Sequence, residues 1–202
     1  MLQYLLLSSL LVLSTAQQCS FNNGDISAKW QVANGEIIIE LTNKNIGNNQ
    51  WTGIGFGSSM RDQDVVLFMV KNNRPTMVTG YTTDYAPPIL DQSPSVNAEL
   101  IQYNSNTLVA RFSRPLGASG PRNLNLGQCM TWNFPSSGAV NADGSVGKHF
   151  SLPVQIQVCP QQCTATAGFL QRDVATDPIP IAAVYNNRQS QRFDGLYPGQ
   201  PS

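Results

Sequence analysis

Two residues stand out for the chemistry that their types and positions could support, Met60 and His149. Met60 lies in a short polar break within GIGFGSSMRDQDVVLFMV, residues 53–70, between two apolar segments. A methionine inside a strand is explained by packing in the core. A methionine in a Gly/Ser turn needs another explanation for its position. Considered separately, Met60 predicts only a side chain that fills an apolar gap. His149, the one histidine of the chain, predicts only a surface residue at the end of a strand. Neither residue by itself establishes a site.

The rest of the sequence excludes several kinds of chemistry. A single histidine excludes copper and zinc centres built from several imidazoles. A Ser-His-Asp triad would have to use His149, yet the sequence has no Gly-x-Ser-x-Gly elbow. The glycines of residues 53–57 are not followed by a helical pattern, so they do not form a phosphate cradle. Lysine plus arginine equals aspartate plus glutamate at 12 each, so no nucleic-acid or anionic-membrane partner is indicated.

The four cysteines, Cys19, Cys129, Cys159 and Cys163, indicate two disulfides in an oxidising compartment. Three connectivities are possible, and we predict Cys19 with Cys163 and Cys129 with Cys159, which would join the first strand to the end of the last. The alternative is a zinc site, because Cys159 and Cys163 have a spacing found among zinc ligands. Cys19 and Cys129 are isolated, however, and only one histidine is present to complete such a site.

The two ends of the chain differ in composition from its middle. Residues 1–16 contain a leucine-rich run that ends in small residues and predict a secretory signal peptide, with a membrane-anchored form as the alternative. Residues 17–163 are expected to form one domain, and residues 164–202, rich in proline, an extended or poorly ordered tail. The prediction is a secreted, extracellular protein whose mature chain has no membrane span.

A period of two dominates the middle of the chain. In FSLPVQIQV, residues 150–158, the apolar residues share one face, and His149 stands at the start of this closing strand after a Gly/Ser loop at 136–147. Similar alternation occurs around residues 108–112 and 129–134. Further strands are expected at 26–32, 36–42, 51–57, 64–71, 76–82 and 98–103. This pattern predicts an all-β fold, an antiparallel β-sandwich that is immunoglobulin-like in general architecture and forms a single domain.

The run VVLFMV, residues 65–70, is apolar on both faces, so each face needs a dry surface. One interpretation is a central strand covered on both sides by protein. The other is that Val66, Phe68 and Val70, or the residues of opposite parity, line a pocket for a flat apolar ligand.

The order of several motifs resembles the DOMON domain family. The stretch WTGIGFGSSMRDQDVV begins at Trp51, and ARFSRPL (110–116), TWNF (131–134) and His149 follow it. The resemblance covers roughly residues 19–160 and implies a β-sandwich of a secreted or extracellular-facing protein. Members similar to the cytochrome domain of cellobiose dehydrogenase bind haem b through one methionine and one histidine, which match Met60 and His149. Other members need not bind haem.

The resemblance therefore implies a secreted electron-transfer or redox-sensing module that catalyses no reaction by itself. It would hold haem b in a slot of the sandwich, with Met60 and His149 as iron ligands, and would use an extracellular redox partner. The alternative is a haem-free extracellular module that binds a sugar or a protein, and a third possibility is a matrix or adhesion component. No catalytic residue is predicted.

Overall fold

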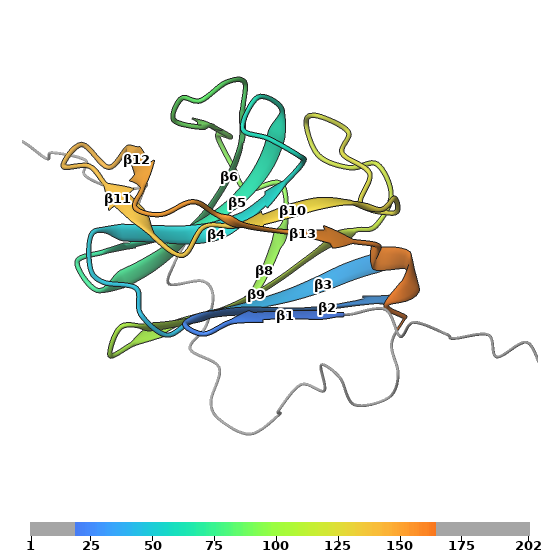
Figure 1. The fold of residues 1–202 in the computed structure, drawn as a ribbon, viewed down its shortest axis with the longest axis horizontal. Helices are drawn as coiled ribbons and strands as arrows, with labels where there is room; N and C mark the ends of the chain where they lie inside the picture. Colours follow the sequence, from blue (N-terminus) through green and yellow to red (C-terminus); the bar gives the residue numbers. More distant parts are fainter. Residues whose placement is uncertain (1–18, 165–202) are drawn as a thin grey trace, which may run out of the picture. The chain divides into compact units, whose positions relative to one another are not determined.

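The computed structural model describes residues 19–164, which form two antiparallel sheets that pack face to face (Figure 1). The five-stranded sheet has the order β1-β2-β3-β9-β8, with β1 (Ser20–Asn23), β2 (Ile26–Ala33), β3 (Glu36–Asn43), β9 (Thr107–Pro115) and β8 (Asn97–Asn104). The eight-stranded sheet has the path β12-β11-β4-β5-β6-β7, with β12 (Val146–His149), β11 (Gly138–Val140), β4 (Gln50–Phe56), β5 (Gln63–Lys71), β6 (Arg74–Thr82) and β7 (Ile89–Leu90). In that sheet β10 (Met130–Phe134) pairs with β4 and with β13 (Val154–Val158). The predicted all-β antiparallel sandwich is confirmed.

The core between the sheets follows from the alternation of apolar residues along the strands. Trp30 of β2 and Trp132 of β10 meet near its centre, with ring centroids 5.1 Å apart. Phe68 of β5 and Phe112 of β9 meet across the two sheets in the same way, and all four side chains are buried. Burial of a large apolar side chain contributes about 1.5–3 kcal/mol, so these inward positions account for much of the stability of the sandwich.

Strand β5 resolves the question raised by its two apolar faces. Val66, Phe68 and Val70 lie in the main core, while Val65 and Leu67 pack on the opposite face of the sheet. The strand is central, between β4 and β6. Both interpretations of this run therefore hold in part, because one face packs in the core and the other provides an apolar surface outside it.

Two predictions for the last part of the chain are wrong. Residues 150–153 do not continue the closing strand: β13 begins only at Val154, and Phe150 and Leu152 are 62% and 87% exposed. Pro153 lacks an N–H for the sheet, which is consistent with a strand that starts after it. The expected loop at 136–147 instead contains strand β11 and the beginning of β12. His149 is consequently the last residue of β12 and not the start of the closing strand.

Both predicted disulfides are confirmed. Cys19 is joined to Cys163 and Cys129 to Cys159, with Cα–Cα distances of 5.6 and 4.0 Å. The first bond ties the start of the domain to the 3-10 helix η1 (Pro160–Gln162) that follows β13. Because these thiols are paired with one another, the zinc alternative is excluded for them.

The expected signal peptide (1–16) and almost all of the expected tail (164–202) lie outside the described residues. Within residues 19–164 we find no helix with the length and apolarity that crossing a bilayer would require.

Candidate functional site

A cleft of about 560 Å³ opens on the face of the eight-stranded sheet that points away from the core. Trp51 of β4 and Val65 and Leu67 of β5 form its apolar base. Its walls come from the segments around residues 58–60, 85–88 and 147–153. Cofactor sites commonly enclose about 300–1,000 Å³. The slot expected inside the sandwich is therefore a cleft outside it, because the space between the two sheets is filled by the core.

Both candidate ligands, Met60 and His149, line this cleft. Met60 lies in the turn between β4 and β5, and His149 ends β12, so the two come from segments far apart in the sequence. Each side chain is half-buried. The structure thus brings a thioether and an imidazole to the border of the same apolar space.

The turn that carries Met60 is held by hydrogen bonds to its backbone carbonyls. The Gly57 carbonyl accepts from Asn133 Nδ2 at 2.6 Å and from Gln63 Nε2 at 3.1 Å. The Ser58 carbonyl accepts from Gln155 Nε2 at 3.4 Å. Asn133 and Gln63 are buried and donate to the same carbonyl, so loss of either amide would remove one of the two hydrogen bonds that hold Gly57. Gly55 leaves room for the Gln63 side chain, because a Cβ at residue 55 would lie 2.5 Å from Gln63 Oε1.

The His149 ring is oriented by a main-chain oxygen. Its Nδ1 lies 2.7 Å from the carbonyl oxygen of Ser151. A carbonyl oxygen only accepts hydrogen bonds, so Nδ1 carries the proton in the neutral ring and Nε2 keeps a lone pair. This is the pattern found for histidines that bind metals through Nε2.

The hairpin of β11 and β12 is fixed against Trp51. Gly138 of β11 lies on the indole ring, where a Cβ would come within 2.3 Å of Trp51 Cε2. The indole Nε1 donates to the Gly147 carbonyl of β12 at 3.0 Å. Only glycine permits this close contact between residue 138 and the indole ring. The glycine content of residues 136–147, which suggested a loop, is therefore what allows the hairpin to pack on Trp51.

The charge of the cleft is low and positive. Among the described residues, Lys148 is the one lysine, arginine or carboxylate residue that lines it. Thr82 also lines it, and the buried hydroxyl of this residue has no hydrogen-bond partner within residues 19–164. The lining therefore suits an apolar molecule that also carries negative charge.

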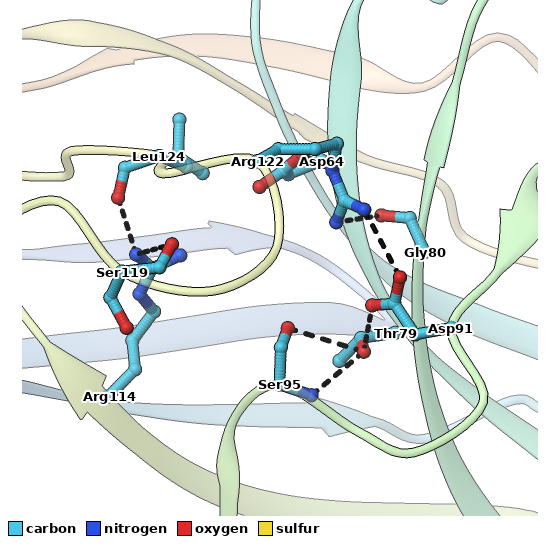
Figure 2. A network of polar contacts seen from close by, with 9 residues as sticks. All are labelled: Asp64, Thr79, Gly80, Asp91, Ser95, Arg114, Ser119, Arg122 and Leu124. Carbon is cyan, nitrogen blue, oxygen red and sulfur yellow. Dashed lines mark hydrogen bonds and ion pairs between the residues drawn. The ribbon is translucent and has the colours of Figure 1, made fainter.

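A polar network around Arg122 was not anticipated from the sequence (Figure 2). Arg122 forms ion pairs with Asp64 of β5 and, at 3.1 Å, with Asp91, and it also donates to the Gly80 carbonyl. Burial disfavours the charge, but the hydrogen bonds to both carboxylates outweigh it and raise the pKa of Arg122. Asp64, next to the apolar run of residues 65–70, was the one available signal, since a carboxylate beside buried positions needs a partner.

Arg114 of β9 belongs to the same region but not to the cleft lining. Its guanidinium donates to the carbonyls of Ser119 and Leu124. Burial lowers the pKa of Arg114, and Asp64 partly offsets that effect. These two arginines fasten the loop of residues 116–126 to the sheets, which is a structural role.

Comparisons with known proteins agree with the sequence resemblance. The sequence model of the DOMON domain matches residues 22–137. A DOMON domain-containing protein of Caenorhabditis elegans is 34% identical over 78% of this chain and 95% of its own length. Another from Caenorhabditis briggsae is 32% identical over 79% of this chain and 96% of its own.

A solved structure shares the fold. The cytochrome domain of cellobiose dehydrogenase from Myriococcum thermophilum superimposes with a TM-score of 0.50 at 12% identity, over 69% of this chain and 77% of that one. At this identity the similarity concerns the fold alone. With the family model and the relatives in agreement over most of the described sandwich, the chain belongs to the DOMON domain family.

Proposed function

We propose that this chain is a secreted module that binds haem b in the cleft, with Met60 and His149 as the axial ligands of iron, and that it serves in electron transfer or redox sensing. The observation that carries the proposal is the position of both side chains on one apolar cleft. A thioether and a neutral imidazole are the pair of ligands found in several electron-transfer cytochromes.

The residues present fit such a group in three ways. The base of Trp51, Val65 and Leu67 offers dry contacts to a flat apolar ring. The Nδ1 hydrogen bond of His149 leaves Nε2 as the donor atom. Lys148 supplies a positive charge for the two carboxylates of haem b.

The chain's own residues define what the site does. Haem iron with a sulfur and an imidazole ligand supplies one-electron transfer and has no open position for a substrate. The apolar base would limit the access of water to the ring, and the hydrogen bonds to the carbonyls of Gly57 and Ser58 hold the backbone just before Met60. We therefore propose an electron carrier, not an enzyme, that exchanges electrons with a separate extracellular partner.

Secretion is part of the same proposal. Two disulfides join Cys19 to Cys163 and Cys129 to Cys159. Such bonds form and persist in oxidising compartments and are rare in the cytosol.

A visible spectrum tests the cofactor directly. The protein purified from an oxidising expression host, or reconstituted with haem, should show a sharp Soret band and narrow α and β bands on reduction. These bands arise because two strong-field ligands give low-spin iron. A protein that stays colourless after reconstitution contradicts the proposal.

The haem-free alternative has less support from the cleft. A sugar is usually bound through free amides, hydroxyls and carboxylates. No carboxylate lines the cleft within residues 19–164, and the amides of Asn133, Gln63 and Gln155 already donate to carbonyls of the Met60 turn, so hydroxyls such as that of Thr82 would have to bind it. A colourless protein would return this alternative to first place, and a glycan or protein array would then be the appropriate measurement.

The role of the Met60 sulfur can be separated from its volume. Met60→Ala should keep part of its haem through His149 but bind carbon monoxide to the ferrous iron, because one axial position becomes open. Met60→Leu should also bind carbon monoxide, although it preserves the apolar volume. Carbon monoxide difference spectra measure both.

The matched control is Met69→Leu. Met69 is half-buried on the same outer face of the sheet but does not line the cleft among the described residues. Its spectrum should remain that of the wild type. A Met60→Leu protein that excludes carbon monoxide would remove Met60 from the ligand set.

A further inference from the structure

We infer that Asn43, a buried residue of the opposite sheet, acts with Ser136 and Ser151 as a positioning group that sets the tautomer of the His149 ring. The tautomer is a property of the metal-free chain. Its consequence for iron binding rests on the proposed function, so the two can be tested separately.

The first step is the contact of the ring itself. Nδ1 of the His149 ring is hydrogen-bonded to the Ser151 carbonyl oxygen at 2.7 Å. This acceptor is a main-chain atom two residues away, so its position depends on the path of residues 150–153. That segment is neither helix nor strand, and therefore something else must fix it.

The second step is what holds that segment. Ser136 Oγ and Ser151 Oγ lie 3.0 Å apart, within hydrogen-bond distance. The Phe150 N–H donates to the Ser137 carbonyl at 2.9 Å. The segment that carries the acceptor for His149 is thus tied twice to the short connection between β10 and β11.

The third step lies in the interior. Asn43 Nδ2 donates to the Ser136 carbonyl at 2.5 Å and to Thr52 Oγ1 at 3.1 Å, and Thr52 in turn donates to the Pro135 carbonyl at 2.9 Å. Asn43 is 1% exposed and Thr52 0%. Buried hydrogen bonds of this kind are expensive to break, so they define the position of the connection firmly.

Together these contacts form a line from the five-stranded sheet to the imidazole. In water an unconstrained neutral imidazole favours the proton on Nε2, which would place an N–H where a metal ligand needs a lone pair. The Ser151 carbonyl reverses that preference, because it accepts only from a protonated Nδ1. Asn43 thereby helps to keep Nε2 of His149 unprotonated, although Asn43 itself does not line the cleft.

The experiment uses the single histidine of the chain. Nitrogen-15 NMR of the full metal-free chain, at a pH where the ring is neutral, reports one imidazole without overlap. The wild type should show the proton on Nδ1. Ser136→Ala, Ser151→Ala and Asn43→Ala should show a measurable population with the proton on Nε2, with the largest fraction in Asn43→Ala.

The loaded protein gives a second readout. Loss of a partner that orients a metal-bound histidine typically weakens metal binding about 10–100-fold, and we expect about a 10-fold rise in the haem dissociation constant for Asn43→Ala. Ser136 and Ser151 meet each other near the surface, so their variants keep the test open if Asn43→Ala does not fold.

Ser145→Ala is the matched control. Ser145 lies next to β12 and bonds to Asp143 and Asn141, not to the segment that contacts His149. It should keep the wild-type tautomer. A wild-type ring protonated on Nε2, or variants that leave the tautomer unchanged, would overturn the inference. A ring protonated on Nδ1 in a chain that never binds haem would support the positioning role and contradict the proposed function.

Discussion

Replacement of His149 by alanine should abolish haem retention during purification and raise the haem dissociation constant more than about 100-fold. Loss of only the group that orients a ligand costs about 10–100-fold, so loss of the ligand itself should exceed that range. His149 is the one histidine of the chain, so no other imidazole can substitute for it. Haem titration followed at the Soret band measures the change.

Two controls give this result its meaning. The His149→Ala chain should keep the wild-type far-ultraviolet circular dichroism, because the ring is half-buried at the end of β12 and outside the main core. Added imidazole should restore part of the haem binding by filling the vacated position. If the variant bound haem with unchanged affinity, His149 would not be a ligand of the iron.

Removal of the Cys19–Cys163 disulfide should lower stability more than removal of the second disulfide. Chain-entropy estimates scale with the length of the closed loop, and this bond spans 144 residues. The double substitution Cys19→Ser, Cys163→Ser should lower the free energy of unfolding by about 5 kcal/mol. Urea unfolding under matched conditions measures it.

The second disulfide provides the comparison. Cys129–Cys159 spans only 30 residues, so the corresponding double substitution should lower the free energy of unfolding by about 3.6 kcal/mol. Both variants retain the buried aromatic core, which should preserve the fold at low temperature. The reverse order of the two losses would show that local packing around Cys159, and not loop length, governs their contribution.

The alternation of apolar residues was enough to predict most of the strands. Strands β2, β3, β4 and β5 match their predicted ranges within one residue at each end, because inward positions along each strand carry large apolar side chains. The disulfide pairing, chosen among three possible connectivities, was also predicted correctly. Strand alternation is local information, so its prediction needs no knowledge of distant contacts.

The failures occurred where a distant residue decides the local structure. Gly138 gave no strand signal, yet it forms β11 because its bare backbone rests on Trp51. Phe150 and Leu152 continued the alternation perfectly, yet they lie outside any strand and are exposed. No pattern in the sequence pointed to Arg122, but it joins two aspartates from separate parts of the chain.

The sequence by itself predicted the two-layer architecture and both disulfides, and it singled out Met60 and His149 as candidate ligands. The tertiary structure decided that these side chains share a cleft, that the cleft lies on the outer face of the eight-stranded sheet, and which nitrogen of His149 is left free. The reason is physical. A strand follows from the residues within it, whereas a cleft and a hydrogen-bond acceptor exist only once segments far apart in the sequence have packed together.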